Sequence, residues 1–438
     1  MDWLQKTLRR FYTLSSNTQG LIISLMLVIT SLSFLFLLNR NNLSIKERNA
    51  SLIEAQSILG GSITLPTRVF DSAFYRGQSL NIFQPGQTIF FLAHIIAAGG
   101  DGGVGMFQAE LFLVFVLTVF VFSMAIYRLT NGQAILSLAI AASFMFGAPY
   151  IASLPVALKG SVYRVNNVLA IFFVVAFLFI ASSKTFYKKL LLAGACIGMA
   201  ILFRLQNALL LFLPLSILFQ DSEGKSWQFS SCFSTPAARV KLATQITKLL
   251  IFPILAFLII AGFQMARFQN PFETGYAYIY IDRSDYLAQR ATTYGLFSVH
   301  FLPENLYQTV LAFPTFKFDG LHFVKIFADP KGNSLLFSQP ILLLLIVLGK
   351  SLSNARAKSY LFTCVLLAIP VWLYHNPGLT APGYMRYSLD YLPLWLATLA
   401  VFARYVPKSR FVICSSIISA AWAIFYGVAL LKIKVISI

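Results

Sequence analysis

Long apolar runs separated by short polar segments extend over the whole of this 438-residue chain. A run of about 18 apolar residues is long enough to cross the hydrocarbon core of a bilayer, which is about 30 Å thick. The candidate spans are Leu21–Leu38, Thr88–Ala98, Phe107–Tyr127, Ala134–Pro149, Val168–Ser182, Leu190–Phe203, Ala208–Phe219, Leu249–Met265, Leu335–Leu348, Tyr360–Leu373, Leu392–Ala403 and Phe411–Leu431. The pattern predicts an all-α polytopic membrane protein with about 11–12 transmembrane helices.

The composition supports a single membrane domain over residues 1–438. Hydrophobic residues make up 58% of the chain and charged residues only 11%, whereas a soluble protein carries about 25% charged residues. The first run, Leu21–Leu38, is too long for the apolar part of a signal peptide, and Asn39-Arg40-Asn41 is not a cleavage site of small residues. We therefore expect a retained first helix.

The net charge of +19 is explained by membrane topology rather than by nucleic-acid binding. The basic residues form short clusters between apolar runs, as cytoplasmic loops do. This places the N-terminus in the cytoplasm, and residues 39–87 and 267–334 become long outer loops in which short amphipathic helices are expected. Ten of the fifteen carboxylates then face outside, namely Glu47, Glu54, Asp71, Glu273, Asp282, Asp285, Glu304, Asp319, Asp329 and Asp390.

The sequence leaves the membrane path of residues 88–127 open, and its Cys and His residues do not indicate a metal site. Residues 88–127 contain two apolar runs where the charge pattern allows one crossing, so either Thr88–Ala98 is re-entrant or Arg128 faces outside. The four Cys and four His residues show no metal-ligand spacing. No cofactor is predicted, and whether a divalent metal is required stays open.

The outer loops carry the residues needed to transfer a sugar from a lipid phosphate. That reaction requires a base for the acceptor hydroxyl and cations for the departing phosphate. Asp71 and Glu47 are the candidate bases in loop 39–87. Glu54 lies in Ser51–Leu59, which has an apolar face at helical spacing, and we interpret it as structural.

Two arginines stand out as candidate phosphate ligands. Arg204 lies between two apolar runs, where a charge is costly unless it is partnered or functional. Arg386 lies at the mouth of a later membrane segment. The alternatives are that both arginines extend to the membrane interface, or that Arg386 pairs with Asp390 at i, i+4.

Three stretches resemble a bacterial member of the GT-C superfamily, the polytopic glycosyltransferases that use polyprenyl-phosphate sugars, of the protein mannosyltransferase and aminoarabinose transferase type. They are EAQSILGGSITLP with FDSAFYRGQSLNIFQPG (residues 54–86), ARFQNPFETGY (residues 266–276), and GNSLLFSQPILLLL with GYMRYSLDYLPLWL (residues 332–345 and 383–396). Each motif alone is weak, but their order along the chain and their placement in outer loops match the family.

The resemblance implies an inverting transferase with an acidic base in the first outer loop and arginines that grip the lipid phosphate. Asp71 matches the acidic position of that loop, and Arg386 matches the arginine of the late motif. Glu47 lies near the place where many relatives carry an acidic pair, so it rivals Asp71 as the base. Relatives often have Pro-Pro-Gly, or Lys before Pro-Gly, where this chain has Gln84-Pro85-Gly86.

The leading hypothesis is a hexosyl- or pentosyltransferase of the bacterial inner membrane that acts on cell-envelope glycans. The donor would be a polyprenyl-phosphate sugar, and the acceptor a glycan, lipid or protein at the outer face. Asp71 or Glu47 would activate the acceptor, and Arg386, Arg204 and Arg76 would hold the phosphate. The alternatives are a transporter or flippase of a lipid-linked glycan, although no internal repeat is visible, and a surface-glycan polymerase or ligase.

Overall fold

The computed structural model of the protein describes residues 11, 13–38, 49–69, 72–99, 104–220, 225–280, 283–319, 323–327, 334–378, 386–405 and 410–432. Its main helices are α2 (Ser16–Leu38), α4 (Pro85–Ala98), α5 (Val104–Leu129), α6 (Ala134–Phe146), α9 (Val162–Ala181), α10 (Leu190–Phe203), α13 (Pro236–Phe268), α18 (Ala355–Trp372), α19 (Leu392–Arg404) and α20 (Arg410–Lys432).

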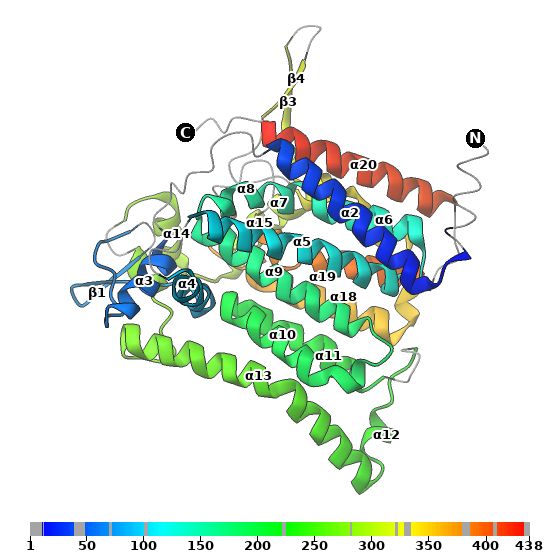
Figure 1. The fold of residues 1–438 in the computed structure, drawn as a ribbon, viewed down its shortest axis with the longest axis horizontal. Coiled ribbons are helices and arrows are strands. Elements are labelled where there is room, and N and C mark those ends of the chain that lie inside the picture. Colours follow the sequence, from blue (N-terminus) through cyan, green and yellow to red (C-terminus); the bar gives the residue numbers. More distant parts are fainter. Residues whose placement is uncertain are drawn as a thin grey trace.

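These helices form stacked layers, which are visible in Figure 1. Helices α2 and α20 cover one side, against α5 and α6, while α9 lies in the middle and α10 and α13 form the opposite side. Large aromatic side chains fill the centre: Phe115 and Phe144 stack on the fully buried Tyr150, with ring centroids 5.3 and 4.6 Å away. The predicted all-α membrane fold is confirmed.

Within the described ranges, six helices are long and apolar enough to cross a bilayer: Met106–Leu129, Ala134–Ile151, Val162–Ala181, Phe186–Phe203, Pro236–Phe268 and Arg410–Leu430. Shorter apolar helices cover Asn17–Ser31, Pro85–Ala98, Leu205–Leu218 and Leu392–Arg404. The protein is therefore an integral membrane protein. Helix α4 has 14 residues and rises about 21 Å, which is less than the bilayer core. It packs against α3 (Ala50–Leu59) of the first long loop and against α10.

The expected span Leu335–Leu348 is not a continuous helix. Residues 335–348 form the short pieces α16 (Leu335–Ser338), η5 (Pro340–Leu343) and α17 (Leu344–Val347). Pro340 lacks a backbone N–H, and its ring clashes with the preceding turn, so it favours a break here, although Pro253 and Pro370 lie inside α13 and α18. The apolar pattern alone did not reveal this break.

The remaining helices are short and lie in loops or at the ends of longer helices. They are α3 (Ala50–Leu59), α7 (Ala148–Ile151), α8 (Ser153–Leu158), η1 (Phe186–Lys189), η2 (Leu205–Leu211), α11 (Phe212–Leu218), α12 (Phe229–Phe233), η3 (Tyr276–Ile279), α14 (Tyr286–Tyr294), η4 (Val299–Phe301), α15 (Leu302–Val310), η6 (Gly349–Ser353) and η7 (Arg386–Asp390). Short helices were expected in both long loops, and α3, α14 and α15 are among them.

Two hairpins were not expected from the sequence. Strand β1 (Ala73–Tyr75) pairs antiparallel with β2 (Gln78–Leu80), with Ala73 opposite Leu80. Strand β3 (Thr315–Asp319) pairs antiparallel with β4 (Phe323–Phe327). The first hairpin turns at Arg76 and Gly77, which both have positive φ, and it belongs to the loop that holds the candidate bases.

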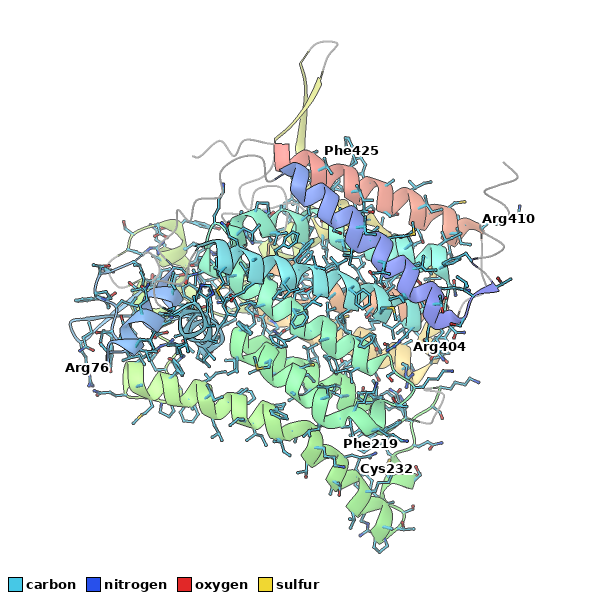
Figure 2. All side chains as sticks on the ribbon, viewed as in Figure 1. Arg76, Phe219, Cys232, Arg404, Arg410 and Phe425 are labelled. Atoms are coloured by element: carbon cyan, nitrogen blue, oxygen red, sulfur yellow. The ribbon has the colours of Figure 1, made fainter. Side chains whose placement is uncertain are left out.

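The two ends of the molecule carry different loops. Figure 2 labels Arg76 at one end and Arg404 and Arg410 at the other. Arg76 belongs to loop 39–87, whereas Arg404 and Arg410 belong to one of the basic clusters expected in the cytoplasm. The structure thus separates the first long loop from this basic cluster.

Helices α10 and α13 approach each other closely because two glycines of α10 face the partner backbone. A Cβ on Gly194 would lie 2.2 Å from the Leu249 carbonyl oxygen, and one on Gly198 would lie 2.8 Å from Phe252. This small-xxx-small spacing lets helices pack in a membrane without intervening side chains.

We expect Gly194→Ala to destabilise the protein by about 1–3 kcal/mol, because the added methyl group overlaps the α13 backbone. The matched control is Gly262→Ala in α13, where an added Cβ meets no atom within 4 Å. The thermal midpoints of both variants in one detergent give the comparison. Equal midpoints for the two variants would contradict this packing.

Candidate functional site

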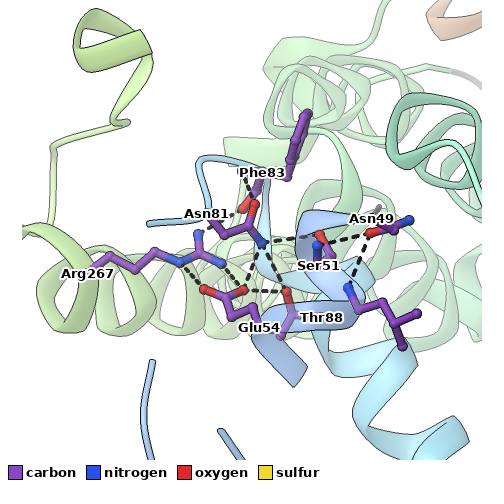
Figure 3. A network of polar contacts seen from close by, with 8 residues as sticks. Asn49, Ser51, Glu54, Asn81, Phe83, Thr88 and Arg267 are labelled. Carbon is purple, nitrogen blue, oxygen red and sulfur yellow. Dashed lines mark hydrogen bonds and ion pairs between the residues drawn. The ribbon is translucent and has the colours of Figure 1, made fainter. Parts of the chain in front are cut away.

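A buried polar network fixes the first long loop to the end of α13 (Figure 3). The Arg267 Nε donates to Glu54 Oε1 at 2.7 Å, and its Nη2 donates to Glu54 Oε2 at 2.5 Å. Both side chains are completely buried. The third guanidinium nitrogen, Nη1, donates to the Phe83 carbonyl oxygen at 2.8 Å. Arg267 therefore binds α3 and the segment before α4 at the same time.

The remaining acceptor capacity of Glu54 is also used inside the protein. Asn81 Nδ2 and Thr88 Oγ1 donate to Glu54 Oε2 at 2.8 and 2.5 Å. Asn49 caps α3 by accepting from the backbone N–H of Ser51 at 2.9 Å. Since its carboxylate accepts four hydrogen bonds, Glu54 is a structural residue, as the sequence suggested, and it does not face the cavity described next.

A cavity of about 480 Å³ lies between this loop, the end of α10, and the segments that follow α13 and α18. Its size is in the usual range for sites that bind small molecules. Its walls are largely aromatic and apolar, with several amides and two arginines. The lining residues are Phe83, Gln84, Tyr163, Asn166, Phe203, Arg204, Leu205, Gln206, Ala208, Leu209, Thr274, Tyr276, Ile279, Tyr280, Arg283, Leu287, Leu296, Phe297, Pro370, Val371, Tyr374, Asn376 and Tyr387.

Arg204 lies in the cavity wall, and its guanidinium is held by a carboxylate that is far away in the sequence. Helix α10 ends at Phe203, and Arg204 takes an extended backbone conformation before η2 begins. Its guanidinium forms an ion pair with Asp390, which is almost fully buried at the end of η7. An arginine carries five N–H donors, so this pair orients Arg204 and leaves further donors for a ligand. The sequence indicated a partner or a function for Arg204, and the partner is Asp390.

The other predicted site residues have different positions. Asp71 and Glu47 lie outside the described residues, although Ser72, next to Asp71, is buried. Arg76 is exposed at the β1–β2 turn, where it donates a hydrogen bond to Gln269 and lies over the Tyr75 ring. Arg76 is not part of the cavity wall. The backbone of Arg386 begins η7, next to Tyr387 of the cavity wall, while its side chain lies outside the described part of the structure.

Gly86 explains the Pro-Gly sequence at the start of α4. A Cβ at this position would lie 2.6 Å from the Leu202 carbonyl oxygen, so glycine allows α4 to begin directly against the end of α10. Pro85 occupies the first turn of α4, where its missing N–H has no intrahelical partner to lose. This contact brings Gln84 close to the turn that carries Arg204.

Tyr280 and His375 form a polar pair at the cavity wall. The Tyr280 hydroxyl and His375 Nε2 are joined by a hydrogen bond of 2.7 Å, and the Arg290 Nε donates to the His375 carbonyl oxygen at 2.7 Å. Burial lowers the pKa of His375 to about 4. The positive charge of Arg290 also lowers this pKa, whereas the hydrogen bond to the Leu296 backbone raises it. His375 is therefore neutral in the folded protein at neutral pH.

We expect this histidine to make stability depend on pH. The unfolded chain binds a proton at His375 below about pH 6.5, whereas the folded protein does so only near pH 4. The contribution of neutral His375 to the free energy of unfolding is thus fully present above pH 6.5. It is lost as the pH falls toward 4, and the loss is at most about 3 kcal/mol. The His375→Gln variant should lose less stability over this range in thermal unfolding. Identical pH profiles for both proteins would contradict the assignment.

No three His, Cys, Asp or Glu side chains gather as metal ligands within the part of the chain that the structure describes.

Sequence comparison identifies no relative: neither a protein-family model nor a curated protein sequence matches the chain. Structural comparison finds the oligosaccharyltransferase of Archaeoglobus fulgidus in its apo form, at 12% identity and a TM-score of 0.51. A second structure of that archaeal enzyme, AglB, in complex with an inhibitory peptide and a dolichol-phosphate, gives 11% identity and a TM-score of 0.46. In both comparisons the likeness covers 94% of this chain and 55% of the archaeal one.

At this identity the likeness concerns the fold, and the chain spans about half the length of the archaeal enzyme. The fold that the resemblance of the three motifs implies is thus confirmed: the chain shares the membrane fold of this archaeal oligosaccharyltransferase.

Proposed function

We propose that the protein transfers a hexose or pentose from a polyprenyl-phosphate donor to an acceptor hydroxyl. The observation that carries this proposal is the cavity beside Arg204 in a GT-C fold. Its wall combines residues of all three stretches that resemble the family: Gln84 from the first, Thr274 and Tyr276 from the second, and Tyr387 from the last. Aromatic walls suit a sugar ring and the first part of a lipid chain.

In the proposed reaction, the oxygen of the acceptor hydroxyl attacks C1 of the sugar from the side opposite the phosphate. Asp71, or Glu47, takes the hydroxyl proton while the bond between C1 and the phosphate oxygen breaks. The configuration at C1 is inverted, and polyprenyl phosphate leaves with the bonding electrons. Arg204, oriented by Asp390, stabilises the negative charge that develops on the phosphate, together with Arg386. Arg76 would act from the rim, because it is exposed outside the cavity.

The proposed active site faces the outer side of a bacterial inner membrane, and the N-terminus is cytoplasmic. The support comes from charge: the cluster with Arg404 and Arg410 lies at the end of the molecule opposite Arg76 (Figure 2). Basic clusters of this kind favour the cytoplasmic side. The acceptor, which is a glycan, lipid or protein, would therefore be a component of the cell envelope.

Mass spectrometry of cell-envelope glycans tests this function. We compare cells with the protein, cells without it, and cells in which a plasmid restores it. The proposal predicts that one hexose or pentose is absent without the protein and returns on restoration. Unchanged glycans together with altered uptake of a solute would contradict it and favour a transporter.

A further inference from the structure

Three side-chain amides in the cavity wall have polar atoms without a partner in the part of the chain that the structure describes. These atoms are Gln84 Oε1, Asn166 Oδ1 and Gln206 Nε2. Asn166 is only 3% exposed, so its oxygen cannot rely on bulk water. A buried amide atom without a hydrogen bond costs about 1–3 kcal/mol, which favours a ligand that satisfies it.

The three amides line the same cavity because their elements are packed against one another. The Phe83 ring contacts the Tyr163 ring edge-on at 5.1 Å, which joins the segment before α4 to the first turn of α9. Asn166 lies one turn after Tyr163 and lines the same cavity. The close approach of Gly86 to Leu202 places Gln84 near the turn that carries Arg204 and Gln206.

The charges in the described part of the cavity wall are balanced. Its two basic residues each have an acidic partner: Arg204 pairs with Asp390, and the Arg283 Nε bonds to Asp285 Oδ2 at 2.6 Å. None of the described lining residues is acidic. Amides that both donate and accept, between aromatic side chains, suit a ring with several hydroxyl groups and no net charge.

We propose that Gln84, Asn166 and Gln206 form the sugar-binding part of the cavity and select an uncharged sugar, with Asn166 as the main specificity-determining residue. This inference rests on the proposed function. A cationic amino sugar would find no carboxylate among the described lining residues, and an anionic uronic acid would compete with the lipid phosphate for the donors that Arg204 keeps beside Asp390. Burying either charge without a partner is costly, so both are rejected.

Binding of synthetic donors to the purified full-length protein in nanodiscs tests this inference. The probes are polyprenyl phosphate alone and the same lipid carrying a neutral sugar (glucose, mannose, galactose or arabinose), 4-amino-4-deoxyarabinose or glucuronic acid. We expect at least one neutral sugar to bind about tenfold more tightly than the bare lipid phosphate. The amino sugar and the uronic acid should gain nothing over the bare lipid phosphate.

Variants at two adjacent asparagines sharpen the test. Asn166→Ala should lose about tenfold in affinity for the neutral donor and keep its affinity for the bare lipid phosphate. Asn167→Ala is the matched control, because Asn167 is equally buried and also has an unpartnered oxygen but does not line the cavity. Asn166→Asp should shift the preference toward the amino sugar. The ratio of donor to bare-lipid affinity within one variant corrects for any partial loss of folded protein.

The outcomes separate this inference from the function on which it rests. If bare and glycosylated lipids bind equally, or if Asn166→Ala and Asn167→Ala have the same effect, the sugar-binding role of the amides is wrong while the donor class stands. If the folded protein binds no polyprenyl phosphate at all, the proposed function is wrong as well.

Discussion

Replacing Arg267 by Met is expected to destabilise the protein by about 3–5 kcal/mol. The variant leaves the Glu54 carboxylate fully buried without its cation, and it removes three hydrogen bonds, to both Glu54 oxygens and to the Phe83 carbonyl. The thermal midpoint in detergent measures this loss. Size-exclusion chromatography after heating gives the fraction of protein that stays folded at each temperature.

Two further variants separate pairing from packing. In the double variant Glu54→Leu with Arg267→Met, no buried charge is left alone, so we expect much of the stability to return. Arg76→Met is the control, because Arg76 is exposed and its loss should change stability by at most about 1 kcal/mol. A single Arg267→Met variant as stable as the original protein would show that the network does not hold the loop.

Replacing Asp71 by Asn is expected to reduce sugar transfer by about 10²–10⁴-fold, the usual contribution of a general base. The amide is nearly isosteric but cannot accept the acceptor's proton. Transfer of a radiolabelled sugar from polyprenyl phosphate to envelope acceptors in membrane vesicles measures the loss. Equal amounts of folded protein, judged by chromatography in detergent, are required for the comparison.

Glu47→Gln is the matched control for Asp71→Asn, because it neutralises the rival carboxylate of the same loop. If Asp71 is the base, Glu47→Gln keeps most of the transfer activity. If Asp71→Asn retains full transfer and Glu47→Gln loses it, Glu47 is the base. Full activity in both variants would place the base elsewhere.

The membrane architecture could be predicted because it depends on local sequence. Apolar runs such as Phe107–Tyr127 became helices at nearly the expected bounds. The structural interpretation of Glu54 could also be predicted, because its helix carries an apolar face that must be buried. The apolar pattern did not predict the break at Pro340, where Leu335–Leu348 divides into short helical pieces.

The pairing of charges could not be predicted, because it depends on which distant segments meet. Arg204 and Asp390 are 186 residues apart in sequence, and Arg267 and Glu54 are 213 apart. Spacing gave a pair of Arg386 with Asp390 only as an alternative to a phosphate-binding Arg386, and it did not indicate the pair of Asp390 with Arg204 that the structure shows. Arg267 lies in a recognised motif, yet no local signal tells which of the outer carboxylates it binds. The cavity amides give no signal in sequence either, since only packing leaves them without partners.

Release of polyprenyl phosphate by the purified protein is the direct test of the proposed transfer reaction. The protein, in nanodiscs, is incubated with polyprenyl phosphate carrying a labelled neutral sugar and with a cell-envelope extract as the source of acceptor. We expect free polyprenyl phosphate and labelled acceptor to appear in equal amounts, and we expect Arg204→Gln to slow the appearance of both. A folded protein that releases no polyprenyl phosphate from any hexose or pentose donor would contradict it.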